Sequence, residues 1–414
     1  MTTTIGPLGA PFWRFWTSTT FANLADGIRA GAFPLIAASL TDSPFGVALI
    51  AACQQGAWLI FGLAAGLLAD RRSPGRVLAA ADTVRVAALA ALLTLLALDA
   101  ATIPILAGAA FVMGAAETFR DTSAQSMLPR LVPERQLERA NGRLFGTEIV
   151  GNEFIGPLLG AALFGIALTA PVAVDAAVLV TAVLLVLTLP RTAAPARSAA
   201  SAGTARLRTE LLLGVRWLLR HPRQRVISAA GSVICFADAA WWSVLVLYSE
   251  SALGVPVAFF GALLAAGAVG GTLGALGSER LAAQFGVRPL LAAAALSTGL
   301  PAVLIALTDS PIAAGALLAL SSAGFALWNV VALSARQRET PPQLLGRVTA
   351  VHRIALYGSG TAGALAGGWI ASSVALTVPF HSAGPLVALA AIGLLITLPP
   401  RPDGGPGHGR SGSE

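Results

Sequence analysis

The stretch Gly66-Leu67-Leu68-Ala69-Asp70-Arg71-Arg72 decides the fold, because a weaker copy of it, Gly274-Ala275-Leu276-Gly277-Ser278-Glu279-Arg280, follows 208 residues later. Other residue pairs share this displacement: Gly46 and Gly254, Arg139 and Arg347, Gly160 and Gly368, Pro171 and Pro379. The displacement is about half of the 414-residue chain, so the sequence predicts two similar halves joined head to tail.

The composition is that of an all-α integral membrane protein. Hydrophobic residues make up 56% of the chain, charged residues 11%, and the mean hydropathy is +0.76. Apolar stretches of about 20 residues recur along the whole length, which matches the thickness of a bilayer in helical rise. In a chain of this kind, an internal duplication is typical of an alternating-access transporter.

The charged residues exclude several other functions. All 27 basic side chains are arginine, and their positions follow the loops between spans, so the net charge of +7 does not indicate a nucleic-acid partner. Without lysine the chain has no phosphate-binding loop for ATP hydrolysis. The four histidines are scattered and suggest no metal site. We expect no cofactor and no enzymatic activity.

Hydropathy predicts twelve membrane-spanning helices in two six-helix halves. Arginine follows spans 2, 4, 6, 8 and 10 and is absent after the odd-numbered spans, so we expect both termini in the cytoplasm and the protein in the inner (plasma) membrane. The predicted spans are 15–40, 45–69, 77–98, 103–127, 143–168, 172–189, 226–249, 256–277, 289–308, 312–335, 349–374 and 380–398.

The domain organisation follows from these spans. Residues 1–189 form the first half and residues 226–399 the second. Residues 190–225 are a cytoplasmic linker whose residues 207–220 read as an amphipathic helix for the membrane surface. Residues 400–414, rich in Gly, Pro and Ser, are expected to be a disordered tail.

The end of span 2 resembles the loop signature of the major facilitator superfamily. Gly66, Asp70 and Arg71 carry the resemblance, but Pro74 stands where that family usually has arginine, and Arg76 comes two residues later. The resemblance implies a conformational latch, in which Asp70 faces a helix N-terminus and loop arginines pair with acids on span 4. The expected latch set is Gly66, Asp70, Arg71, Arg76, Glu117, Arg120 and Asp121. The alternative is an ordinary solvated loop.

A second motif lies in span 5. Gly151, Gly156, Pro157 and Gly160 resemble the glycine–proline motif of exporters in that superfamily. Such glycines make a flat face for a neighbouring helix, and proline bends the chain. A plain packing kink is the other interpretation.

Longer strings narrow the resemblance. Ala81-Asp82-Thr83-Val84-Arg85, Glu117 to Asp121 and Leu128 to Gly142 look like the bacterial branch that includes enterobactin exporters and macrolide efflux proteins. The similarity extends over residues 10–400 and implies a twelve-span fold without naming a substrate.

Ionisable residues inside predicted spans are expensive in lipid and mark candidate functional groups. We expect Asp26, Glu153 and Asp238 to take part in proton coupling, because desolvation favours reversible protonation of a carboxylate. The expected substrate cavity contains Asn23, Arg29, Glu148, Trp241, Trp242, Trp328, Asn329 and Tyr357. For any single aromatic residue, packing or lipid contact is the alternative role.

Together these observations predict a secondary active exporter. Its expected partners are protons, the lipid bilayer and a small amphipathic molecule such as a drug, a macrolide-like compound or a siderophore, and we expect a monomer. The alternatives are an importer or lipid flippase of the same fold, a membrane sensor that does not transport, and a polytopic membrane enzyme. The last lacks a catalytic His/Asp cluster at a membrane face.

Overall fold

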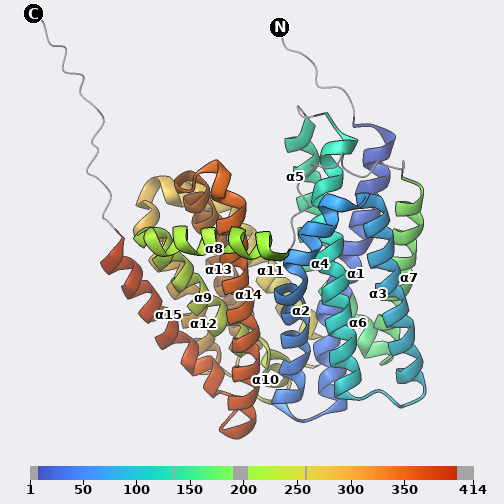
Figure 1. The fold of residues 1–414 in the computed structure, drawn as a ribbon. Coiled ribbons are helices and arrows are strands. Elements are labelled where there is room, and N and C mark those ends of the chain that lie inside the picture. The colour runs from blue at the N-terminus through green and yellow to red at the C-terminus, as the bar shows by residue number, and fades with distance from the viewer. Residues whose placement is uncertain (1–7, 134–135, 190–203, 257–258, 399–414) are drawn as a thin grey trace, which may run out of the picture.

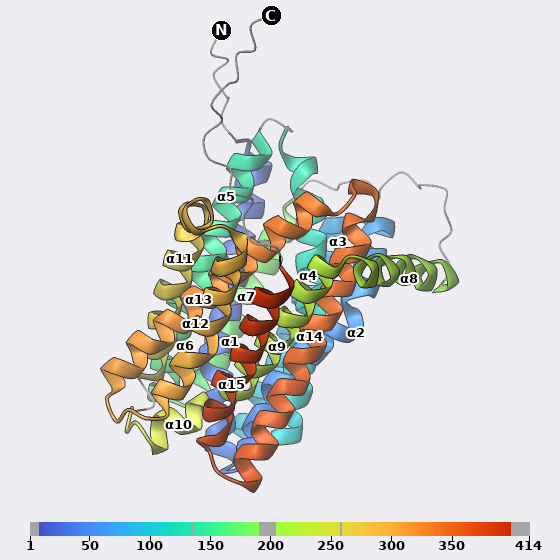
Figure 2. The same ribbon diagram turned by 90° about the vertical axis from the view of Figure 1, so that its left-hand side faces the viewer.

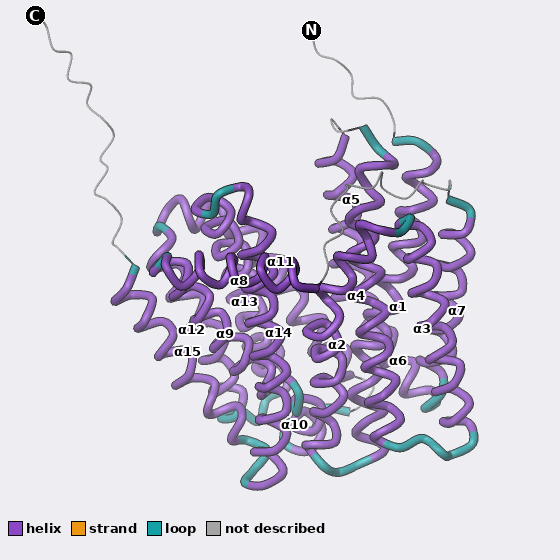
Figure 3. The backbone as a smooth tube through the Cα atoms, viewed as in Figure 1, coloured by secondary structure: helices purple, strands orange, loops and turns teal. Residues whose placement is uncertain are grey.

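The computed structural model describes residues 8–133, 136–189, 204–256 and 259–398, and within these ranges it contains helices and loops but no strand. Long, roughly parallel helices make up the molecule (Figures 1 and 3). The helices up to the central linker are α1 Ala10–Leu40, α2 Pro44–Arg71, α3 Pro74–Ala97, α4 Ile103–Leu131, α5 Leu137–Glu148, the π-helix η2 Ile149–Ile155, α6 Gly156–Ile166 and α7 Ala170–Leu187. The rest are α8 Thr204–Arg220, α9 Pro222–Trp242, α10 Leu245–Ser251, α11 Phe260–Phe285, α12 Val287–Ile305, α13 Pro311–Glu339, α14 Pro342–Ser373 and α15 Val378–Thr397.

Among the described residues, ten helical stretches are long and apolar enough to cross a membrane, judged by length and composition. Helices α1 and α14 are as long as the others but are not among these ten. Both carry several polar and charged side chains, including Asp26 and Arg29 on α1 and His352 and Arg353 on α14. The composition therefore supports a multi-pass membrane protein without fixing the number of spans at twelve.

Two predicted spans differ from the structure. The span expected at 143–168 starts earlier and is divided by η2, and the span expected at 226–249 is divided into α9 and α10 after Trp242. Helix α9 begins at Pro222, so the last residues assigned to the linker are already part of a long helix. Helix α8 occupies the stretch predicted to be amphipathic and runs at a steep angle to the long helices (Figure 2).

Proline sets the start of most helices. Pro44, Pro74 and Pro311 each stand in the first turn of their helix, where the missing N–H costs no hydrogen bond and the fixed φ angle suits the helix. Ser43 and Ser310 cap α2 and α13, because each side chain accepts a hydrogen bond from a backbone N–H three residues later.

The helix contacts form two matching sets. In the N-terminal bundle, α1–α7, helix α4 packs on α2 and α3, and α7 packs on α1 and α3. In the C-terminal bundle, α9–α15, helix α13 packs on α11 and α12, and α15 packs on α9 and α12. The bundles meet through α2 with α14 and α6 with α11. At one end, the Phe45 N–H donates to the Ser372 hydroxyl at 2.9 Å.

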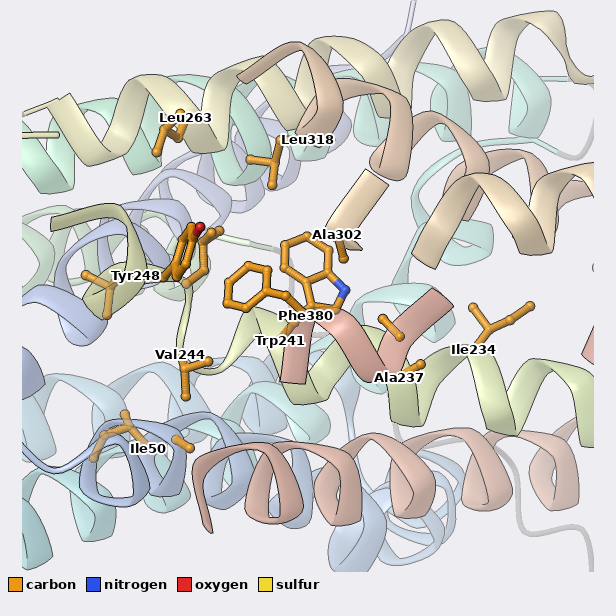
Figure 4. Close-up of a cluster of buried hydrophobic side chains, with 14 of the residues drawn as sticks. Ile50, Ile234, Ala237, Trp241, Val244, Tyr248, Leu263, Ala302, Leu318 and Phe380 are labelled. Atoms are coloured by element: carbon orange, nitrogen blue, oxygen red, sulfur yellow. The ribbon is translucent and has the colours of Figure 1, made fainter. Parts of the chain in front are cut away.

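An aromatic cluster lies among smaller aliphatic side chains inside the C-terminal bundle (Figure 4). Phe380 of α15 lies between Trp241 of α9 and Tyr248 of α10, with ring centroids 5.6 and 4.4 Å away. The Tyr248 hydroxyl donates to the carbonyl of Ile305 at 3.1 Å, which satisfies its polar end. This cluster holds the broken pair α9 and α10 against α12 and α15.

Glycines bring α1 against the η2–α6 segment at backbone distance. A Cβ on Gly27 would lie 2.5 Å from the Gly151 carbonyl oxygen and 2.8 Å from the Gly156 Cα. A Cβ on Gly151 would lie 3.1 Å from the Leu24 nitrogen. The predicted flat face of the glycine–proline motif therefore packs on α1, and its partners are backbone atoms that cannot move aside.

We predict that Gly27→Ala destabilises the protein by about 1–3 kcal/mol, because the added methyl overpacks a backbone contact. The matched control is Gly108→Ala on α4, where a Cβ would meet nothing within 4 Å. That change should be neutral or stabilise by about 0.5–1 kcal/mol, since alanine is the better helix former. Thermal unfolding of both variants in detergent tests the contrast, and equal effects would contradict the packing described here.

Candidate functional site

Two connected cavities lie between the bundles. The polar cavity has a volume of about 1090 Å³ and the apolar cavity one of about 600 Å³. They share Ala51, Gln54 and Gln55 of α2 in their walls. The polar cavity reaches Leu128 near the end of α4 and Asn141 near the start of α5, so it lies toward the arginine-bearing loops. The apolar cavity extends the other way, toward α10 and the start of α11.

Most of the charged residues that line the polar cavity belong to the N-terminal bundle. Trp58 of α2 and Tyr357 of α14 close one side as a stacked pair, with ring centroids 5.4 Å apart and planes 13° from parallel. This stack joins the two bundles across the cavity. The ionisable lining residues are Asp26, Glu117, Arg120, Asp121, Glu148, Arg353 and Tyr357.

The apolar cavity is lined by both bundles. Phe33 comes from α1, Trp242 from α9, Phe260 from α11 and Phe325 from α13. Two carboxylates enter this lining from opposite bundles, Glu153 on η2 and Asp238 on α9. Asn329 of α13, Arg29 of α1 and Pro157 of α6 are also in the wall.

A buried ion network joins α1, α3 and α4 beside the cavities. The Arg29 Nη2 lies 2.6 Å from Glu117 Oε2 and 2.9 Å from Asp26 Oδ1. Arg85 pairs with the same Asp26 oxygen and lies 3.2 Å from Asp82. The Arg120 Nε lies 3.0 Å from Asp82 Oδ1. The network is thus Asp26, Arg29, Asp82, Arg85, Glu117 and Arg120, and it contains as many acids as arginines.

This network changes the interpretation of the predicted latch. We expected Glu117, Arg120 and Asp121 to meet arginines of the cytoplasmic loops. In the structure Glu117 pairs with α1, Arg120 pairs with α3, and Arg120 also lies 3.7 Å from Asp121. Glu117 and Arg120 therefore have partners on neighbouring helices, whereas Asp121 has Arg120 of its own helix and lines the polar cavity. Arg76 is exposed in the first turn of α3, and the surroundings of Gly66, Asp70 and Arg71 lie outside the part of the chain that the structure describes.

Two of the predicted cavity tryptophans lie elsewhere. Trp241 is fully buried in the aromatic cluster of the C-terminal bundle (Figure 4), and Trp328 is buried against the Gly231 face of α9. Neither lines the polar or the apolar cavity. The structure places the remaining predicted cavity residues in these walls: Asn23, Glu148 and Tyr357 in the polar cavity, and Arg29, Trp242 and Asn329 in the apolar cavity. The three predicted coupling acids divide as Asp26 in the polar cavity and Glu153 and Asp238 in the apolar one.

The π-helix explains how one segment can line both cavities and also pack against α1. Its hydrogen bonds join residues five apart, such as the Gly156 N–H and the Gly151 carbonyl. Residues five apart therefore lie nearly on one face, whereas in an α-helix they would diverge. Gly151 and Gly156 both face α1 for this reason. Glu148 and Glu153 have the same spacing, and they enter the walls of the polar and the apolar cavity.

Several buried or cavity-lining polar residues were missed from the sequence. Asp175 of α7 is buried, and neither of its carboxylate oxygens has a hydrogen-bond partner among the described residues. A lone acid in the apolar run 170–187 was the signal. Gln54 and Gln55 interrupt span 2 in the same way, and Asp82 and Arg85 were noted only as family markers.

We predict that Arg29→Gln destabilises the protein by about 3–5 kcal/mol, because it removes the buried cation that Asp26 and Glu117 share, and Glu117 has no other ion-pair partner among the described residues. The control is Arg223→Gln. Arg223 lies 2.9 Å from Glu339, but these side chains are 41% and 29% exposed, so the loss should stay below about 1 kcal/mol. Unfolding in detergent measures both, and an Arg29 variant no less stable than the Arg223 variant would refute the assignment.

Comparisons with known proteins identify the fold family. The Major Facilitator Superfamily matches residues 15–363 of the chain. A search of curated proteins finds no match. Among solved structures, a mutant of the nucleoside transporter NupG superposes with a TM-score of 0.77 at 14% identity, covering 94% of this chain and 100% of that one.

Two further solved structures are similar to this chain. A bacterial homologue of the iron transporter ferroportin, in an inward-facing state, has a TM-score of 0.73 at 15% identity and covers 94% and 99% of the two chains. A bacterial homologue of the human lysosomal transporter Spinster, inward-facing and unoccupied, has a TM-score of 0.63 at 17% identity and covers 94% of each. Identities this low establish the fold alone, but the family match extends over most of the helices and both cavities. The chain is a multi-pass membrane protein that belongs to the major facilitator superfamily of transporters.

Proposed function

We propose that this transporter is a proton-coupled exporter of a small amphipathic molecule and works by alternating access. The observation that carries the proposal is the apolar cavity, into which Glu153 and Asp238 extend from opposite bundles. Arg29 is the one cation in its described lining, and Asp26 and Glu117 already pair with it. Carboxylates left without a cation beside apolar walls suit reversible protonation, and their two bundles move relative to each other during transport.

The proposal assigns twelve spans and two halves. Helices α1 and α14 then cross the membrane with their polar residues directed inward, as polar groups in spans usually are. Residues 1–189 and 226–399 are the halves, 190–225 the linker and 400–414 the tail. The arginine-bearing loops favour cytoplasmic termini in the inner (plasma) membrane.

The position of the polar cavity supports loading from the cytoplasm. It lies toward the arginine-bearing loops, while at the other end the bundles approach closely. A Cβ on Gly261 of α11 would lie 2.7 Å from the Pro157 carbonyl oxygen and 2.8 Å from the Leu158 Cα. The glycine–proline motif thus touches α1 on one side and the opposite bundle on the other. We propose that the α6–α11 contact keeps the loading state from leaking. The latch role of Gly66, Asp70, Arg71 and Arg76 rests on the sequence.

We predict that Asp238→Asn and Glu153→Gln each abolish proton-driven uptake into inverted membrane vesicles, because neither amide can take up and release a proton. The control is Asp42→Asn, an exposed loop acid outside both cavities. The variants should reach the membrane in normal amounts. Wild-type transport rates in both cavity variants would show that coupling resides elsewhere.

We predict that the protein lowers the accumulation of a recognised toxic compound in energised whole cells and that a protonophore reverses this. Gly261→Leu should abolish the effect, because the side chain cannot fit against the α6 backbone. The control is Gly277→Leu on the same helix, where the nearest atom to a Cβ is the flexible Leu281 side chain at 3.6 Å. Higher accumulation on expression in energised cells would mean import and would refute the proposal.

A further inference from the structure

The charge of the residues that line the apolar cavity indicates which substrate charge the cavity can bind. Its described lining contains two carboxylates, Glu153 and Asp238, and one cation, Arg29. Arg29 is paired with Asp26 and Glu117 and so contributes no free positive charge. Among the described residues, neither Glu153 nor Asp238 forms an ion pair. The cavity therefore has an excess of negative charge when both acids are ionised.

The groups around the two carboxylates do not offset this excess. Glu148 precedes η2 in the chain, and Cys235 lies near Asp238 on α9. Helices α2, α11 and α13 present uncharged polar side chains, namely Gln54, Gln55, Thr272, Ser322 and Asn329. Trp242, one helical turn from Asp238, is a hydrogen-bonding neighbour of its carboxylate but brings no charge.

The rest of the wall fits an apolar body. Phe33, Trp242, Phe260 and Phe325 surround the space, and its volume of about 600 Å³ lies within the range of about 300–1,000 Å³ for small-molecule sites. Aromatic faces also attract a cation through their quadrupoles. The site thus combines apolar walls, aromatic faces and two acids.

We propose that the substrate is an organic cation with an apolar body, and that its charge binds between Glu153 and Asp238. This inference rests on the proposed transport function. A bound anion would face two carboxylates in an apolar setting, where like charges are costly. A neutral molecule would bring no partner for either acid. A cation replaces a proton on the same carboxylates, so loading the substrate releases a proton to the cytoplasmic side.

The placement of the two carboxylates on different bundles links this exchange to the movement of the bundles. Glu153 belongs to the N-terminal bundle and Asp238 to the C-terminal bundle. A cation held between them bridges the bundles, and rocking of one bundle against the other alters both contacts together. The cation and the proton therefore compete for one site.

The test uses two ions of nearly the same shape and opposite charge. Tetraphenylphosphonium and tetraphenylborate are titrated against the purified full-length protein in nanodiscs by calorimetry. We expect tetraphenylphosphonium to bind at least about tenfold more tightly than tetraphenylborate, and its affinity to fall as the pH is lowered. Asp238→Asn and Glu153→Gln should each weaken its binding at least about tenfold, as expected for removing one of the two carboxylates that hold the charge. Glu250→Gln, an exposed acid outside both cavities, should leave it unchanged.

The alternative outcomes separate this inference from the transport function. The cation site would be overturned if tetraphenylphosphonium did not bind, or if tetraphenylborate bound equally or more tightly. It would also be overturned if both carboxylate variants bound tetraphenylphosphonium as tightly as the wild type. Proton-driven export of a neutral or anionic compound alongside such a result would leave the proposed function standing. If tetraphenylphosphonium bound in a carboxylate-dependent way but nothing were transported, the cation site would be supported and the exporter assignment would be refuted.

Discussion

The need to pair charge inside an apolar bundle is the constraint on which the rest of this structure depends. Arg29 lies between Asp26 and Glu117, and Arg85 and Arg120 continue the chain of contacts to Asp82. An unpaired charge in such a setting costs several kcal/mol, so the positions of α1, α3 and α4 are tied to one another. The opposite face of α1 is fixed by glycine contacts with η2 and α6. Helix α1 is therefore held on two sides, and the cavities open along the surfaces that remain.

This constraint also explains which acids are available for chemistry. The acids of the network are committed to arginines, whereas Glu148, Glu153 and Asp238 lie in cavity walls and form no ion pair among the described residues. Asp26 was expected to share a coupling role with Glu153 and Asp238. In the structure Asp26 contacts Arg29 and Arg85 and so also ties α1 to α3. Their ion-pair partners, and not their depth, thus separate the paired acids from the unpaired ones.

The sequence was sufficient to predict the helices, but it was not sufficient to predict which side chains of different helices pair. Long apolar runs that begin at proline, such as those after Pro44 and Pro311, predict helices because local chemistry determines them. The Arg29–Glu117 pair joins residues 88 positions apart, and no local pattern indicates that distance. The division of span 5 was missed because a π-helix differs from an α-helix by one residue, which hydropathy does not register. Trp241 and Trp328 carried no signal that separates a packed aromatic residue from one that lines a cavity.

The seven-residue π-helix has a mechanical consequence. It contains one residue more per hydrogen-bonded ring than the α-helix on either side, so it stores a register offset between α5 and α6. If the segment tightened into an α-helix, α5 would screw forward by one residue, a turn of about 100° with a rise of about 1.5 Å. Gly156 and Pro157 could stay against α1 and α11 while Glu148 left its place in the wall. Such a change would move Glu148 relative to Gly156 within one helix, without any movement of the loops.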